Sequence, residues 1–262
     1  MTKQSRLGAL LQILAERGTL EVESAASRLG VSSATIRRDL DTLAAQQLLT
    51  RTHGGAVATG SAFDLPLRHR REDTAAAAKR RIAKAAVGMI RRGAILGMNG
   101  GTTTTEVARA IIQHREFGTR DPWPALTIVT NAINIATELT VHEQFKIVVS
   151  GGVARPNSYE LTGPFASAVF DEVLLDVAFI GVEGLDPERG AAARHEDEAV
   201  VNRHLVERSK RVVVVATHDK FGRSAFARIC RTEQIDALIT DRMPADTVAD
   251  ALRARGVEII VA

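Results

Sequence analysis

Cysteine is almost absent from the chain, since Cys230 is the single thiol among 262 residues. One thiol excludes an internal disulfide framework and fits a protein of the reducing cytoplasm. Long apolar runs are absent too, because no stretch approaches the roughly 18 uninterrupted apolar residues that span a bilayer. The first residues, MTKQSRLGALLQ, lack the apolar block and cleavage site of a signal peptide. We therefore expect a cytoplasmic protein with no membrane partner.

The composition is otherwise that of an ordinary globular protein. Apolar residues make up 45% and charged residues 25% of the chain, and its length suggests one large or two modest domains. The charge is uneven: residues 1–81 carry 13 Lys and Arg against eight Asp and Glu, whereas residues 82–262 carry 21 against 23. The net positive charge of residues 1–81 favours a polyanionic partner. The excess is small, so a function cannot rest on it alone.

The first 57 residues have the pattern of a small head with three helices and a wing. Gly30 is placed to end the second helix, and Ser32 or Ser33 can cap the third. Residues 48–51 predict a strand, which Gly54-Gly55 turns back on itself. Apolar residues recur at helical spacing in each helix. They are Leu7, Leu10, Leu11 and Leu14, then Val22, Ala25, Ala26 and Leu29, then Ile36, Leu40, Leu43 and Ala44. This layout predicts a winged helix-turn-helix.

The third predicted helix offers a basic face to DNA. Stepping along the helix from its buried stripe places Arg38 on the opposite face, with Thr35 and Arg37 on the flanks. The first residues of such a helix reach base edges, and arginine can pair bidentately with guanine. The alternative, a solvated basic face on an ordinary helical bundle, is disfavoured by the wing. The predicted DNA-binding residues are Ser33, Thr35, Arg37, Arg38, Arg51 and His53.

The rest of the chain predicts a larger domain of a different kind. Residues 58–72 contain arginines without an apolar period, which indicates a linker. An Ala-rich helix follows, and short Val- and Ile-rich runs then alternate with helical patterns. Such alternation is typical of a mostly parallel α/β sheet. We predict an α/β protein with a winged head over 1–57, a linker over 58–72 and an effector-binding and oligomerisation domain over 73–262.

Polar, glycine-rich loops follow several of the predicted strands. Parallel sheets bind ligands at the carboxyl ends of their strands, and the loop at 99–103 opens a helix whose N-terminus can bind an anion. The loop is not a Walker loop, because it has no lysine. Each loop alone is compatible with a plain turn, but together they predict a pocket for a phosphorylated small molecule. The predicted effector-binding residues are Asn99, Gly100, Gly101, Thr102, Thr103, Asn131, Gly151, Gly152, Glu183 and Lys220.

The acidic run His195-Glu196-Asp197-Glu198 is a weak candidate for a metal site. Its residues are adjacent rather than spaced along one helix face, and acids are expected at a helix start. We interpret the run as a solvated helix terminus. No metal, cofactor or catalytic residue is predicted.

In order along nearly the whole chain, these segments resemble DeoR-type bacterial transcriptional regulators. The resemblance implies a winged-helix head and a sensor body related to ribose-phosphate isomerases. It also implies a repressor of carbohydrate genes that acts as an oligomer and responds to a sugar phosphate. The segments that carry it are Leu29–Leu40, Arg51–Val57, Asn99–Thr103, Thr130-Asn131, Gly151-Gly152, Phe179–Asp186 and Lys220-Phe221-Gly222.

The chain departs from the family pattern at three strand ends. Asn99-Gly100-Gly101 stands where the family commonly has Asp-Ser-Gly, Thr217 replaces an Asp, and Glu183 replaces the Asp of an Ala-Asp-Gly segment. Two carboxylates are thus lost and one is lengthened. Because sugar hydroxyls often bind carboxylates, the effector can differ from those common in the family.

The sequence therefore favours a repressor that binds a double-stranded DNA operator as a homo-oligomer and that a small phosphorylated sugar releases. An activator with the same head is an open alternative. A sugar-phosphate isomerase with an accessory head is disfavoured by the lost carboxylates, although Glu183, Asp186 or Asp219 could be proposed as its base.

Overall fold

The computed structural model of the chain describes residues 6–10, 13–14, 19–45, 49–52, 54–58 and 73–262. Contacts divide the chain into two compact units, Met1–Leu65 and Pro66–Ala262. The linker predicted over 58–72 lies outside the described residues except for Ala58, and so do Leu11, Leu48 and His53. Within the described part, no helix is both long enough and apolar enough to cross a membrane.

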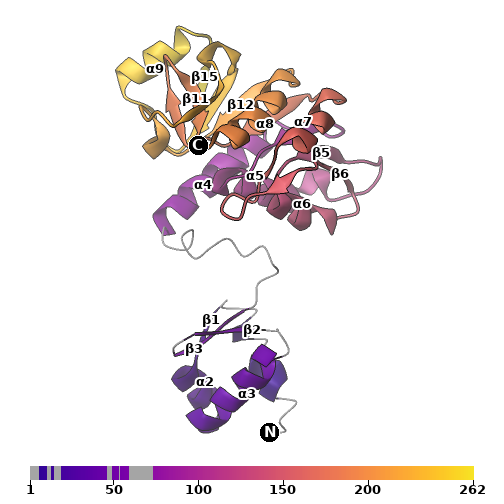
Figure 1. The fold of residues 1–262 in the computed structure, drawn as a ribbon, viewed down its shortest axis with the longest axis vertical. Helices are drawn as coiled ribbons and strands as arrows, with labels where there is room; N and C mark the ends of the chain where they lie inside the picture. The colour runs from indigo at the N-terminus through magenta and orange to yellow at the C-terminus, as the bar shows by residue number, and fades with distance from the viewer. Residues whose placement is uncertain (1–5, 11–12, 15–18, 46–48, 53, 59–72) are drawn as a thin grey trace. The chain divides into compact units, whose positions relative to one another are not determined.

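The smaller unit is a helical head with a three-stranded antiparallel sheet (Figure 1). Residues 6–10 and 13–14 are helical, and they bury Leu10 and Leu14 against the other two helices. The sheet has the order β1-β3-β2. The head elements are β1 (Thr19–Glu21), α2 (Val22–Leu29), α3 (Ser33–Ala45), β2 (Leu49–Thr52) and β3 (Gly55–Ala58). The predicted third helix and wing are confirmed.

Local signals explain where the head helices begin and end. Gly30 takes a left-handed conformation with φ of 65° after α2, as a glycine C-cap does. The hydroxyl of Ser32 accepts the backbone N–H of Thr35 at 3.2 Å, so Ser32 rather than Ser33 caps α3. Ile36 and Leu40 are fully buried, and their spacing fixes which face of α3 points away from the core.

The larger unit is built on a seven-stranded sheet in which every pair of neighbours is parallel. Its strand order is β15-β14-β12-β9-β4-β5-β6, so the carboxyl ends of all seven strands lie along one edge. The strands are β4 (Ile95–Met98), β5 (Leu126–Thr130), β6 (Phe145–Val149), β9 (Val177–Ile180), β12 (Val212–Val215), β14 (Ala237–Thr240) and β15 (Glu258–Val261).

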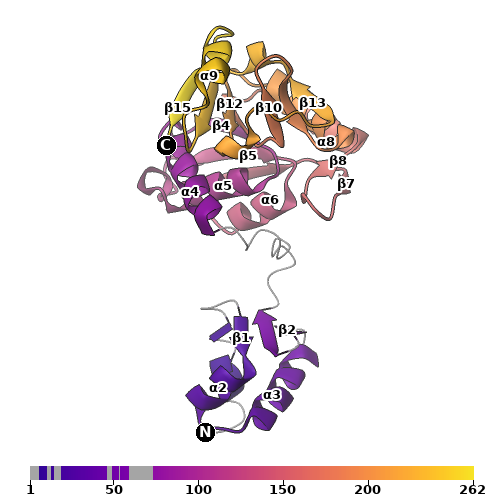
Figure 2. The same cartoon turned by 90° about the vertical axis from the view of Figure 1, so that its left-hand side faces the viewer.

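Helices cover both faces of this sheet (Figures 1 and 2). Val213 and Val215 face the core shared with α4, α5 and α6, whereas Val212 and Val214 face the core shared with α7, α8 and α9. Burial on both faces explains why these strands are continuous apolar runs. The helices are α4 (Asp73–Val87), α5 (Thr102–Gln113), α6 (Ile133–Thr140), α7 (Pro164–Asp171), α8 (Glu196–Glu207) and α9 (Asp246–Arg253).

Smaller elements that the sequence pattern did not predict connect these helices and strands. An antiparallel sheet has the order β10-β11-β13, and β7 and β8 form a two-stranded hairpin. They are β7 (Val153–Ala154), β8 (Leu161–Thr162), β10 (Gly184–Asp186), β11 (Gly190–Ala193) and β13 (Ala227–Cys230), with short 3-10 helices at Arg115–Phe117, His218–Lys220 and Thr232–Gln234. The hairpin and its loop lie beside the end of β5, because Ala132 and Glu160 form a bridge.

Candidate DNA-binding and effector sites

The outer face of α3 carries the two arginines predicted to meet DNA. Arg37 and Arg38 are exposed, as is Ala34, and Thr35 is half-buried. Asp39, on the inner side, is buried and paired with Arg6. Among the described residues neither Arg37 nor Arg38 forms an ion pair. Their charges are therefore available to phosphates or base edges.

Other predicted DNA-binding residues are already engaged within the head. The hydroxyl of Ser33 donates to Glu23 Oε2 at 2.9 Å, and the Thr35 hydroxyl lies 2.9 Å from that of Ser32. Arg51 Nε donates to Asp41 Oδ1 at 2.9 Å and its Nη1 to the Gly55 carbonyl at 2.6 Å. Arg51 thus braces the wing against α3, and a contact with DNA requires it to leave these partners. His53 lies outside the described residues.

In the larger unit, the N-terminus of α5 follows β4 through a glycine turn. Gly101 precedes the helix with φ of 136° and offers no side-chain cap. The amides of the first helical turn have no carbonyl partner within a helix, and the helix dipole favours negative charge there. The hydroxyls of Thr104 and Thr105 turn back to the Gly101 carbonyl. The predicted Thr102 and Thr103 thus begin a helix that can bind an anion.

Asn99, a predicted effector contact, is bonded to the end of a neighbouring strand. It is 2% exposed, and both ends of its amide are used: Nδ2 donates to the Gly181 carbonyl at 3.0 Å and Oδ1 accepts the Gly181 N–H at 2.7 Å. Asn99 therefore joins the ends of β4 and β9. These two bonds shape the loop that follows β4.

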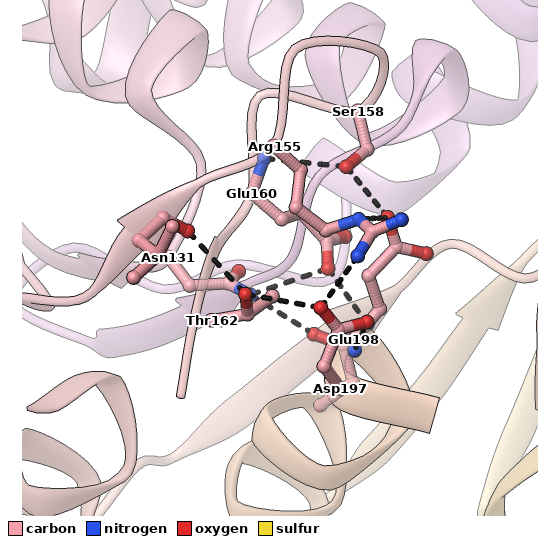
Figure 3. Close-up of polar contacts among 9 residues, drawn as sticks. Asn131, Arg155, Ser158, Glu160, Thr162, Asp197 and Glu198 are labelled. Carbon is pink, nitrogen blue, oxygen red and sulfur yellow. Dashed lines mark hydrogen bonds and ion pairs between the residues drawn. The ribbon is translucent and has the colours of Figure 1, made fainter. Parts of the chain in front are cut away.

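Asn131 also lies inside the protein, in a buried polar cluster around Glu160 (Figure 3). Its Nδ2 lies 3.3 Å from Glu160 Oε2 and 3.2 Å from Asn202 Oδ1, and Asn202 Nδ2 donates to the same Glu160 oxygen at 3.2 Å. Burial first, and then the nearby charge of Glu198, raise the pKa of Glu160 to about 8. Hydrogen bonds from Asn202, Gly100 and Asn131 oppose that rise.

The acidic run at the start of α8 is only partly the solvated helix terminus expected from the sequence, because Glu196 is exposed whereas Asp197 and Glu198 form ion pairs. Figure 3 shows Asp197 and Glu198 turned toward Arg155. Arg155 Nη1 lies 2.5 Å from Asp197 Oδ2, and Arg155 Nε lies 3.2 Å from Glu198 Oε1. The Ser158 hydroxyl donates to the same Glu198 oxygen at 2.6 Å. Burial would raise the pKa of Asp197, but the bonds from Arg155 and other donors lower it overall. These contacts tie the hairpin loop to α8.

Glu183 and Lys220, both predicted effector contacts, lie together. Lys220 Nζ is 3.5 Å from Glu183 Oε2, and Arg194 is 3.0 Å from the other oxygen of the same carboxylate. A parallel bridge between Leu185 and Phe221 holds the two segments side by side. Because Glu183 has a second cation, Lys220 can turn to another anion without leaving that carboxylate unpaired.

Gly151 and Gly152 lie beside the hairpin and the start of α7. A Cβ on Gly152 would lie 2.5 Å from the Thr162 carbonyl, and one on Gly151 would lie 3.2 Å from the Phe165 carbonyl. Close packing of the backbone therefore requires glycine at position 152, and leaves little room for a side chain at position 151. Two buried polar atoms nearby, Asn131 Oδ1 and the Ser150 hydroxyl, have no partner among the described residues, which is unusual for native interiors.

Glu160 and Asn202, at the centre of this cluster, were not among the residues predicted from the sequence. Glu198 and Asn202 share the buried stripe of α8 with Val201 and Leu205, and a polar pair within an apolar helical stripe was the available signal. Glu160 gave no such signal, because its burial depends on a hairpin of two-residue strands.

Comparison with known proteins covers both units. Residues 6–62 match the family model for a DeoR-like helix-turn-helix domain, and residues 74–242 match that for the DeoR C-terminal sensor domain. The glycerol-3-phosphate regulon repressor of Escherichia coli K12 is 31% identical over 99% of this chain and 99% of its own. The regulator GlpR of Haloferax volcanii is 33% identical over 99% and 98%. Among solved structures, the sorbitol operon regulator SorC from Klebsiella pneumoniae covers 96% of this chain and 99% of its own, at 13% identity and a TM-score of 0.39.

Proposed function

Because the chain belongs to the DeoR family of transcriptional regulators, we propose that it is a cytoplasmic, homo-oligomeric repressor of carbohydrate-metabolism genes. A small phosphorylated sugar releases it from operator DNA. Family membership places the chain among regulators and not enzymes, so the isomerase alternative is discarded. The repressors among its relatives favour repression over activation.

The DNA-binding part of the proposal rests on the difference between the two faces of α3. One side buries Ile36 and Leu40 completely, and the other exposes Arg37 and Arg38. In a helix-turn-helix, such a helix enters the major groove. Arg38 and Thr35 are proposed to contact bases, whereas Arg37, Arg51 and His53 are proposed to contact phosphates or the minor groove, and Ser33 belongs to the same face.

The observation that supports the effector half is the uncapped N-terminus of α5. Gly101, Thr102 and Thr103 provide backbone donors at a positive helix end. Lys220 is proposed to supply a cation beside Glu183, and Gly100, Asn131, Gly151 and Gly152 shape the strand ends around the effector. Asn99 contributes by joining two of those ends.

Release follows from linkage between the two sites. A ligand that binds more tightly to one arrangement of the effector-binding domains shifts the relative placement of the DNA-binding heads. The ratio of the ligand's affinities for the two arrangements sets the largest possible fall in operator affinity. Half-sites about one helical turn apart favour a symmetric oligomer.

A mobility-shift titration tests the proposal. The probe is the promoter region beside the protein's own gene, and the additions are a panel of pentose, hexose and triose phosphates that includes glycerol 3-phosphate, named in the E. coli relative. We expect a specific protein–DNA complex that at least one of these phosphorylated compounds dissociates. Its unphosphorylated analogue should leave the complex intact. A complex that forms equally on unrelated DNA would disprove the operator-binding half.

A further inference from the structure

Glu160 joins three parts of the larger unit besides its own loop. Its carboxyl is contacted by Asn131 after β5, by Asn202 in α8 and by the backbone N–H of Gly100 after β4. A Cβ on Gly100 would lie 2.5 Å from Glu160 Cγ and 2.9 Å from its Oε1. The glycine at position 100 is therefore required by the approach of Glu160.

The backbone around Glu160 is fixed from both sides. Arg155 N–H donates to the Glu160 carbonyl at 2.9 Å, Leu161 N–H donates to the Asn131 carbonyl at 2.6 Å, and Ile133 N–H donates to the Tyr159 carbonyl at 3.0 Å. Figure 3 shows the Glu160 side chain pointing into the space between Asn131 and Glu198. The hairpin loop thus fixes the position of the side chain, which is shielded from solvent because the residue is only 3% exposed.

Building on the proposed effector site, we propose that Glu160 is its positioning residue: it holds the Gly100–Thr103 turn in the conformation that binds the anionic group of the effector. Glu160 is too buried to touch the effector. It acts through Gly100, which leads into the N-terminus of α5, and through Asn131 at the end of the neighbouring strand.

The protonation state of Glu160 gives this role a pH dependence. The charged groups around it are Glu198 and Asp197 from α8 and Arg155 from its own loop, whereas the loops after β4 and β5 present the uncharged Gly100 and Asn131. Burial and Glu198 raise the pKa of Glu160 to about 8. The carboxyl is therefore neutral at neutral pH and becomes charged beside Glu198 in alkali, which introduces repulsion within the cluster.

The sign of the effect follows from linkage. A group whose pKa is higher in the folded state stabilises the fold fully below its ordinary pKa, and this stabilisation is lost as the pH rises through the raised value. For Glu160 the loss is complete at about pH 8. The turn is therefore expected to loosen as the pH rises toward about 8 and to change little at higher pH.

Amide hydrogen exchange of residues 100–105 in the full-length protein tests the positioning role without any ligand. Wild type, Glu160→Gln and a control, Glu207→Gln on an exposed position of α8, are compared from about pH 6.5 to about pH 9.5. After correction for intrinsic rates, protection of the turn should fall roughly tenfold in wild type and in the control, and stay constant in Glu160→Gln. The same pH profile in wild type and Glu160→Gln would overturn the proposal.

Sulfate binding, measured by calorimetry, tests the consequence for the site, because sulfate remains a dianion over this range. Glu160→Ala should weaken binding by roughly tenfold or more at every pH, because it leaves buried donors unpaired. Glu160→Gln should restore binding and remove the alkaline loss. Unimpaired binding by Glu160→Ala contradicts the proposal. If sulfate fails to bind wild type while the exchange difference persists, the proposed effector site is wrong and the hold of Glu160 on the turn stands.

Discussion

At the scale of single residues, some charged side chains of the head are paired within it, whereas others are exposed and form no ion pair among the described residues. Asp39 is buried against Arg6, and Arg51 braces the wing. Arg37 and Arg38 form no ion pair among the described residues and stay exposed. Charge alone did not distinguish these arginines, because all of them lie in the same basic segment. Their partners decide which of them can reach a phosphate or a base.

Replacing Arg38 with alanine should weaken binding to the operator and relax its base preference. If Arg38 pairs with a guanine, the loss is about 1–3 kcal/mol and is confined to the matching base position. Fluorescence anisotropy on the operator and on single-base variants measures both effects, with Arg91→Ala, an exposed residue of the larger unit, as the control. A uniform loss over all sequences would instead make Arg38 a phosphate contact.

Replacing Lys220 with alanine should leave operator binding intact and blunt release by the sugar phosphate. A charge-assisted hydrogen bond contributes about 1.5–3 kcal/mol, so half-release should need roughly tenfold or more effector. Glu183 keeps Arg194 as its partner in this variant, which limits damage to the fold. The exposed Lys146→Ala is the control. Unchanged release by Lys220→Ala would remove Lys220 from the site.

At the scale of elements, the wing depends on one close approach. A Cβ on Gly55 would lie 1.8 Å from the Leu20 carbonyl of β1, whereas a Cβ on Gly54 meets no atom within 4 Å. Gly55→Ala should therefore destabilise the head by about 1–3 kcal/mol and weaken DNA binding, while Gly54→Ala should be nearly neutral. Urea unfolding of the two variants followed by a head-specific probe measures the difference, and equal stability would show that β1 is not paired as described.

Which elements the sequence could predict depended on their length and on their neighbours. Strands buried on both faces, such as Val212–Val215, and helices with an apolar stripe were predictable from local pattern alone. β1 and the hairpin of β7 and β8 were not, because strands of two or three residues carry no period. The same limit hid Glu160 and Arg155, whose surroundings are assembled from segments far apart in the chain.

The candidate effector site was likewise predictable only where its residues are neighbours in the sequence. The glycine turn at Gly101 and the helix start at Thr102 were predictable because they are adjacent in sequence. The bonds between Asn99 and Gly181 were not predictable, because the two residues lie 82 positions apart in the sequence. The acids of α8 were taken for a solvated terminus because their partner, Arg155, is 42 residues away from Asp197.

At the scale of the whole molecule, the uneven charge of the chain predicts the salt dependence of DNA binding. Residues 1–81 have a net charge of +5 and the remainder −2. Each phosphate contact adds about −0.9 to the slope of log affinity against log salt concentration. Arg37→Ala should reduce the steepness of that slope by about 1 with little change in sequence preference. A slope unchanged by this substitution, measured by anisotropy over a range of salt, would remove Arg37 from the phosphate contacts.

The most direct test of the account is reciprocity between the two sites. The operator affinity is measured with and without saturating active sugar phosphate, and the affinity for that sugar phosphate is measured with and without operator. Linkage predicts that both ratios are equal, and a coupling of about 1–3 kcal/mol would make them roughly 5- to 150-fold. A sugar phosphate that binds free and DNA-bound protein equally well would contradict the claim that effector binding controls the docking of the head.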